Sequence, residues 1–312
     1  MREKDIARAH QLEAALLSFH QENQALPGIV PVDNRLALVE QLLDSIRRVQ
    51  YVQVIREKAH SPLRIDAASE MFDPLKAAAI HSAQGNAEEA CWLVFLATHF
   101  GKHRSAGWRL VRDVYGALGT GRPWSWVRIS ADPNGLSQWL GANYQQLTGD
   151  GIPRHFGNHR KYETLRPTSE KGTGAVVASY VDWVQQYGSH QQLFQAAMDE
   201  TGANSHTAFR WLYDSMSVLR FGRTAKFDYL TMLTKLQLAP IVADSAYLIG
   251  ATGPLRGARL LFGGSTRAAL TVPALDGWLV ELAQVLEIGM QEMEDALCNW
   301  QKTPNQFVRF RG

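Results

Sequence analysis

Apolar residues recur at helical spacing along nearly the whole 312-residue chain, and the alternation typical of strands is scarce. Residues 3–22 and the segment that begins at Leu36 each carry one apolar face. Residues 87–99 are apolar on most sides, which predicts a buried helix. The fold class is therefore predicted to be all-α. Further helices are expected at about 108–118, 175–187, 190–200, 205–219 and 226–237, with a long loop at 149–174.

Composition limits what such a helical chain can be. With 46% hydrophobic and 20% charged residues, it is typical of one large globular domain or two lobes. A net charge of +2 means that nucleic-acid binding would need a local basic face. Two widely separated cysteines, Cys91 and Cys298, argue against a disulfide framework and a four-cysteine iron–sulfur cluster. The N-terminal segment is charged and amphipathic, and apolar runs of about 18 residues are lacking, so we expect a cytoplasmic protein without a membrane span.

Residues 248–286 combine a glycine hairpin, an apolar helix, a loop, and an aspartate in front of a second apolar helix. Gly250 and Gly253 bracket the hairpin, where positive φ or close approach of another backbone is easiest for glycine. Asp276 lies in a Pro-x-x-Asp-Gly sequence. Because aspartate is a favoured helix cap, a purely structural Asp276 in an αα-hairpin is the alternative interpretation.

This order of features resembles the helix-hairpin-helix DNA glycosylases, in which a glycine hairpin binds DNA phosphate and a downstream aspartate does the chemistry. The hairpin departs in length, since Ala251 and Thr252 separate the glycines where the family has a single residue. The resemblance implies two helical lobes with a cleft between them, in a domain of residues 35–312 after an N-terminal helical extension of residues 1–34. It also implies a catalytic Asp276 and DNA-backbone contacts from Gly250, Gly253, Arg256 and Arg259.

Base excision requires a carboxylate beside the sugar, a role that Asp276 could fill. Cleavage of an N-glycosidic bond passes through an oxocarbenium-like sugar, which an ionised carboxylate stabilises. If a helix begins at Asp276, its free N–H groups and dipole favour the anion. A bifunctional glycosylase would also need a lysine amine to form a Schiff base. Loose alignment places Leu255 at that position, so we predict a monofunctional enzyme that uses water.

Residues 154–163 and 220–229 mix basic side chains with aromatic ones, which suits a flipped or single-stranded nucleotide. A solvated loop and a helix cap with core phenylalanines are the respective alternatives. The pattern His-Phe-Gly-x-His occurs at 99–103 and again at 155–159. Zinc is not predicted there, because glycine interrupts each pair and no cysteine or acidic ligand lies nearby. The candidates for base or DNA contact are His99, Phe156, His159, Arg160, Lys161, Tyr162, Arg223, Phe227 and Asp228.

Four sequence blocks together are similar to the α-glutamyl/putrescinyl thymine pyrophosphorylase family, third clade. They are WLVFLATHFGKH (92–103), FGNHRKYETL (156–165), FGRTAKFDYL (221–230) and MEDALCNWQK (293–302), so the resemblance covers roughly residues 35–302. It implies a divergent helix-hairpin-helix glycosylase fold associated with hypermodified bases in phage DNA. The family name reflects a role in decorating pyrophosphorylated hydroxymethyluracil. Relatives are linked to bacterial defence as glycosylases that remove glucosylated phage bases.

The leading prediction is a monofunctional DNA glycosylase that flips and excises a hypermodified base, such as glucosylated hydroxymethylcytosine, and leaves an abasic site in anti-phage defence. We expect a monomer that acts on phage DNA without a cofactor, with a monovalent cation at the hairpin left open. The first alternative is a transferase that modifies pyrophosphorylated hydroxymethyluracil in DNA. The second is a non-catalytic DNA-binding protein. Asp276 favours hydrolysis, because amine transfer does not require a carboxylate beside the sugar.

Overall fold

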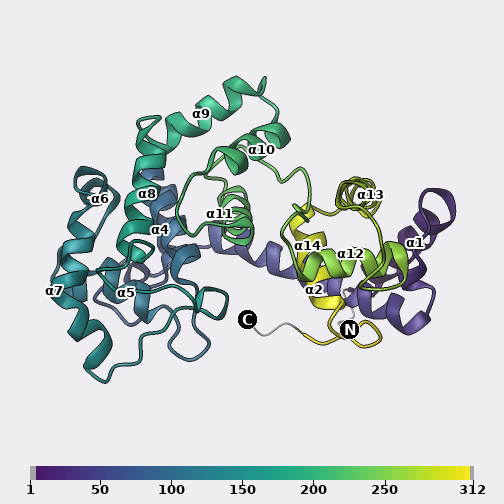
Figure 1. Cartoon of the computed structure of the whole chain (residues 1–312), viewed down its shortest axis with the longest axis horizontal. Helices are drawn as coiled ribbons and strands as arrows, with labels where there is room; N and C mark the ends of the chain where they lie inside the picture. Colours follow the sequence, from purple (N-terminus) through teal and green to yellow (C-terminus); the bar gives the residue numbers. More distant parts are fainter. Residues whose placement is uncertain (1–4, 310–312) are drawn as a thin grey trace. The chain divides into compact units, whose positions relative to one another are not determined.

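The computed structural model describes residues 5–309, apart from the side chain of Asn158. Within that range, β-type pairing is limited to one isolated bridge between His103 and Gly107. This confirms the all-α class (Figure 1). The α-helices are α1 (Ile6–Glu22), α2 (Val32–Glu57), α3 (Pro74–Ala83), α4 (Ala87–Phe100), α5 (Arg109–Tyr115), α6 (Trp126–Ala131), α7 (Gly135–Gly149), α8 (Thr173–Gln185), α9 (His190–Glu200), α10 (Ser205–Ser215), α11 (Arg223–Lys235), α12 (Gly253–Gly263), α13 (Val272–Val285) and α14 (Met290–Trp300). Short 3-10 turns are η2 (Pro27–Ile29), η3 (Pro62–Arg64), η4 (Ala117–Gly119) and η5 (Asn158–Arg160).

Polar side chains at the caps determine where several helices begin. Asp73 and Asn86 accept hydrogen bonds from backbone N–H groups in the first turns of α3 and α4. Ser189 and Asn204 do the same for α9 and α10. Each cap satisfies donors that have no partner inside the helix. The local sequence therefore fixes where α3, α4, α9 and α10 begin.

The chain forms two compact units. The first contains residues 5–52 together with residues 243–309, and the second contains residues 53–242. In the first unit, α1 packs on α13, and the Arg8 guanidinium donates to the Leu286 carbonyl oxygen at 2.8 Å. The boundary at residue 34 that the sequence suggests stays a prediction.

Close packing of α12 on α14 holds the first unit together. The two helices lie side by side (Figure 1). A Cβ at Gly257 would overlap the Leu297 carbonyl, and one at Gly253 would lie 2.6 Å from the Cys298 Sγ. Both glycines therefore allow an approach that any side chain would prevent.

Helix α4 forms the centre of the second unit, as predicted for residues 87–99. Trp92 and Phe95 are fully buried, and α3, α9 and α11 pack around this helix. The Phe95 ring lies 3.7 Å from the Tyr180 ring of α8 between centroids, and the Trp92 indole donates to the Trp124 carbonyl oxygen. This aromatic core fixes the elements that carry most of the polar residues described below.

Candidate functional site

Asp276 lies on α13, in the unit formed by the two ends of the chain. The helix begins at Val272 after Thr271, so Asp276 is its fifth residue and the predicted helix-cap position is wrong. Pro273 explains the earlier start, because proline is preorganised for the first turn. The support that helix N–H groups and the dipole give to an anion weakens beyond that turn. The half-buried carboxylate instead accepts a hydrogen bond from the Leu248 backbone N–H at 3.3 Å.

Leu248 opens the tight turn that the sequence identified as a hairpin. Ala251 N–H donates to the Leu248 carbonyl oxygen at 3.0 Å, and Gly250 has a φ of 76° with open space around it. Ile249 stands at the tip with 75% of its surface exposed. The turn leads into α12, whose first turn has no side-chain cap. Its N–H groups are therefore candidates for holding a phosphate.

The other hairpin residues divide between packing and surface. Gly253 is the first residue of α12, and its contact with Cys298 explains the glycine without a DNA phosphate. Arg256 is exposed on α12, whereas Arg259 is half-buried. Arg256 is therefore the better placed of the two to meet DNA.

The two His-Phe-Gly-x-His segments meet, in antiparallel order, within the second unit. Gly157 N–H donates to the Phe100 carbonyl oxygen at 2.8 Å, and the Phe100 and Phe156 rings stack with centroids 5.5 Å apart. The His103 and His155 rings lie 4.8 Å apart. No cluster of three or more potential metal ligands occurs among residues 5–309. The hydrogen bond and the ring contacts show that the paired segments make a packing contact between α4 and the 150–160 loop.

His99 belongs to the core of this contact. It is 1% exposed, and its Nε2 lies 3.1 Å from the Thr173 hydroxyl, which donates to the Thr164 carbonyl oxygen. His99 Nε2 must therefore carry the hydrogen and donate it. Burial, assisted by the charges of Arg160 and Arg220, lowers the pKa of His99 to about 3. The imidazole is neutral at physiological pH.

Two arginines fasten the 156–163 loop to the rest of the second unit. Arg160 Nε donates to the Thr98 carbonyl oxygen at 2.7 Å, and its Nη2 lies 3.0 Å from the Asp228 carboxylate of α11. Arg220 donates to the Tyr162 carbonyl oxygen at 3.2 Å and pairs with the Glu163 carboxylate at 3.3 Å. Arg160, predicted to contact DNA, is thus largely engaged in holding the loop.

The solvent-exposed side chains of the 156–163 loop are basic and aromatic. Tyr162 is 77% exposed, and Lys161 Nζ lies 5.1 Å from the centre of its ring. His159 is exposed, whereas Phe227 is buried with the Arg223 guanidinium 5.0 Å from its ring centroid. The exposed members of the predicted set therefore gather around Lys161 and Tyr162, while His99 and Phe227 are core residues. Asp276 belongs to the first unit and all these residues to the second.

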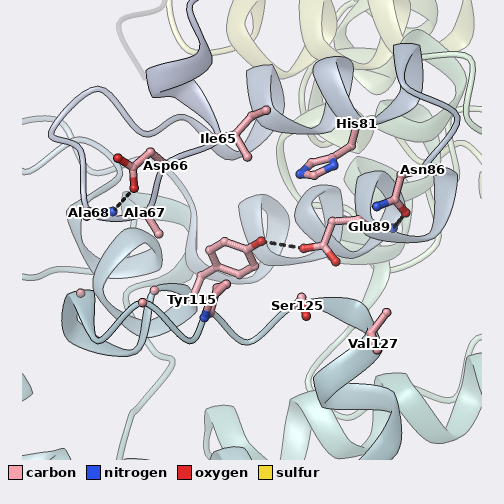
Figure 2. Close-up of a pocket in the computed structure, with 14 residues that line it drawn as sticks. Ile65, Asp66, Ala67, Ala68, His81, Asn86, Glu89, Tyr115, Ser125 and Val127 are labelled. Atoms are coloured by element: carbon pink, nitrogen blue, oxygen red, sulfur yellow. Dashed lines mark hydrogen bonds between the residues drawn. The ribbon is translucent and has the colours of Figure 1, made fainter.

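A partly open cavity of about 520 Å³ lies in the second unit, bordered by α3, α4, α5, α6 and the loop after α2 (Figure 2). Glu89 is the buried carboxylate among the lining residues and is 4% exposed. The carboxylate accepts hydrogen bonds from the Tyr115 hydroxyl at 2.7 Å and the Trp126 backbone N–H at 2.6 Å. Burial raises the pKa of Glu89, against the lowering effect of these two donors.

Sequence analysis missed this residue for a local reason. Glu88 and Glu89 follow the Asn86 cap of α4, where acidic residues simply complement the helix dipole. The sequence signal for Glu89 is its place in a helix that is otherwise apolar on most sides. A carboxylate in such a helix requires a buried partner.

Glu88 has its own buried network. Its Oε2 accepts from His190 N at 3.1 Å and from His190 Nδ1 at 2.6 Å. With Nδ1 as the donor, His190 Nε2 accepts from the Tyr180 hydroxyl at 2.6 Å, and the Tyr180 oxygen lies 2.9 Å from the Tyr229 hydroxyl. Burial lowers the pKa of His190, although Glu88 opposes the shift. This chain of hydrogen bonds joins α4, α8, α9 and α11.

A family model described as alpha-glutamyl/putrescinyl thymine pyrophosphorylase clade 3 matches residues 33–312. The chain belongs to this family. Membership confirms the resemblance given by the four sequence blocks, and the alpha-glutamyl/putrescinyl thymine pyrophosphorylase clade 3 family indicates an enzyme that acts on modified DNA bases. Comparison with curated proteins and with solved structures gave no match. Within residues 5–309, every helix is too short or too polar to cross a bilayer.

Proposed function

We propose that this protein is a DNA N-glycosylase that hydrolyses the glycosidic bond of a hypermodified base, with Asp276 as the essential carboxylate. The observation that carries the proposal is the hydrogen bond from Leu248 N–H to Asp276. It joins the carboxylate directly to the turn that precedes the uncapped α12. A phosphate held at the helix N-terminus would thus be fixed relative to the group that acts on a nearby sugar.

In the proposed reaction, the bond between C1′ and the base nitrogen breaks, and the base leaves with the bonding electrons and takes up a proton. Ionised Asp276 stabilises the positive charge that develops on the sugar and orients a water molecule. The water oxygen bonds to C1′ and loses its proton, which gives an abasic site. The Leu248 N–H stabilises the carboxylate in its ionised form.

Exposed Lys161 and Tyr162 supply the chemistry for contact with nucleic acid in the second unit. A lysine neutralises phosphate and an aromatic face stacks on a base, irrespective of sequence. Flipping a base costs a few kcal/mol of stacking, and such contacts offset part of that cost. The proposed biological role is defence against phages whose DNA carries modified bases.

The decisive experiment compares DNA that contains normal, hydroxymethylated or glucosylated cytosine. After incubation with the protein, mass spectrometry identifies released bases, and an aldehyde-reactive probe counts abasic sites. Release of the glucosylated base alone supports the proposal. A second reaction uses DNA that contains pyrophosphorylated hydroxymethyluracil. If that base stays in the DNA with a changed mass, the transferase alternative is established. Binding without either change would leave a DNA-binding protein.

A further inference from the structure

The cavity around Glu89 has a one-sided charge. Two carboxylates contribute to its lining, buried Glu89 on α4 and exposed Asp66 on the loop after α2. No lysine or arginine is among the residues that line it. A volume of about 520 Å³ lies within the range of small-molecule sites. An anionic ligand would therefore meet repulsion, whereas a cationic one would be attracted.

Glu89 has hydrogen-bonding capacity left for a ligand. A carboxylate offers about four acceptor positions on its two oxygens. Tyr115 and the Trp126 N–H use one on each oxygen, and within residues 5–309 these two donors are the groups that act on the Glu89 carboxylate, with no cation among them. A buried carboxylate without a counter-charge is costly, so a bound cation would stabilise it.

A second polar group of the cavity, the imidazole of His81, has a ring nitrogen without a partner in the described structure. His81 Nε2 is shielded from solvent and makes no hydrogen bond in the described structure. Burial lowers the pKa of His81, so the ring is neutral. Ser125 precedes α6 but forms no cap bond with its side chain. Figure 2 shows His81, Glu89, Tyr115 and Ser125 around the same space. Buried polar atoms without partners are rare in folded proteins, and a bound water, ion or ligand is one explanation for such an atom.

We propose that this cavity binds a small organic cation with several N–H donors, an amidinium or a primary ammonium. The cation pairs with the Glu89 carboxylate and donates further hydrogen bonds to Ser125 or His81. Ile65, Ala67 and Pro123 provide apolar contacts for its carbon skeleton. The cavity belongs to the second unit and Asp276 to the first, and the inference is independent of base excision.

The competing explanation is that Glu89 only connects helices. Its bonds to Tyr115 of α5 and to the first N–H of α6 serve that purpose. This explanation accounts for the carboxylate but not for the open cavity beside it or for the unpartnered His81 Nε2. The two explanations differ in whether the purified protein binds a cation there.

The test uses four probes that share a benzene ring and differ in head group: benzamidine, benzylamine, benzamide and benzoate. Binding to the full-length protein is measured by isothermal titration calorimetry. We expect benzamidine or benzylamine to bind, and neutral benzamide and anionic benzoate to bind at least about tenfold more weakly. A hydrogen bond to a charged group accounts for a difference of that size. The stronger of the two cations then distinguishes an amidinium site from an ammonium site.

Three variants locate the binding. Glu89→Gln removes the charge and should weaken the cation at least about tenfold. Val127→Trp places a bulky ring at the cavity edge, where Val127 is 78% exposed, and should block binding without touching a buried group. Glu200→Gln, an exposed carboxylate away from the cavity, should have no effect. If Glu89→Gln fails to fold, the loss or retention of cation binding in Val127→Trp shows whether the cation occupies this cavity. Equal binding of benzamidine and benzamide, no binding of either cation, or full affinity in the Val127→Trp protein would overturn the proposal.

Discussion

Gly101 and Gly157 approach so closely that a Cβ on Gly157 would lie 2.9 Å from the Gly101 Cα. The contact joins the end of α4 to the loop that carries Lys161 and Tyr162. Gly101 also has a φ of 66°, which favours glycine. The repeated His-Phe-Gly pattern thus reflects two backbones packed on each other, and the surface of the loop depends on that packing.

Gly157→Ala should lower the free energy of unfolding by about 1–3 kcal/mol, because the new methyl group meets backbone atoms that cannot rotate away. The matched control is Gly141→Ala in the same unit, where the nearest atom is 3.6 Å from the new Cβ. That change in an exposed helical position should be neutral or stabilising by about 0.5–1 kcal/mol. Urea denaturation measures both. Equal stability of the two variants would contradict the packing argument.

Asp276→Asn should reduce base release by about two to three orders of magnitude while DNA affinity changes little, since the charge is lost and the shape is kept. The Asn side-chain oxygen still accepts from Leu248 N–H, so the turn should remain intact. Glu281→Gln, an exposed change on the same helix, is the control and should retain full activity. Single-turnover release of labelled base provides the measurement. Near-native turnover by Asp276→Asn would rule out the proposed mechanism.

The product should be an intact strand with an abasic site. Strand cleavage through β-elimination requires a Schiff base from an amine. Leu255, on the first turn of α12, occupies the position that loose alignment gives to the lysine of bifunctional enzymes. Denaturing gels before and after alkali treatment distinguish the two products. A protein–DNA adduct trapped by borohydride would refute this prediction.

Lys161→Glu should weaken DNA binding and lower the slope of log affinity against log salt by about 0.7–0.9 for each lost phosphate contact. The side chain is exposed and its removal leaves the loop anchors in place. Arg160→Glu should behave differently, because it breaks the ion pair between Arg160 and Asp228. We expect this substitution to lower the thermal stability of the protein. Fluorescence anisotropy over a salt series and thermal unfolding separate these effects. A slope unchanged by Lys161→Glu would remove the loop from the DNA interface.

His99 should make the protein less stable at mildly acidic pH. Its pKa is about 3 in the folded state and about 6.5 when unfolded. As pH falls from about 6.5 towards 3, the unfolded state takes up a proton that the folded state does not, so the free energy of unfolding decreases. The loss approaches about 1.4 kcal/mol per pH unit. His99→Gln should lessen the stability difference between about pH 7 and about pH 5, measured by urea denaturation. An unchanged difference would show that His99 titrates normally.

Strong apolar periodicity made the helices predictable. Residues 87–99 were expected to form a buried helix, and α4 occupies that place because its apolar side chains face the core on most sides. The expected helix at 190–200 coincides with α9. Helices α3, α6, α7 and α14 were not predicted. The alanine-rich sequence of α3 gives a weak periodic signal and α6 has only six residues, so tertiary packing determines both helices. Helix α14 does carry an apolar face, which includes Met293, Leu297 and Trp300.

Site residues were harder to predict, because their roles depend on contacts distant in sequence. Asp276 was expected at a helix start, but Pro273 shifts the start of α13 one turn earlier. His99 and Phe227 have the residue types of a binding pocket, yet both are buried. Nothing in the local sequence indicates that Glu89 would meet Tyr115 or that a cavity would remain beside it.

The discontinuity of the first unit has a consequence for synthesis on the ribosome. Residues 53–242 form a contiguous unit and can pack as soon as they emerge. Helix α1 is made first, but its partner α13 emerges only after that whole unit. The apolar face of α1, with Leu12, Leu16 and Phe19, therefore stays without its contact to α13 until the end of the chain has been synthesised. Chaperones that bind apolar helices would bind α1 during translation, before the helix that bears Asp276 has been synthesised.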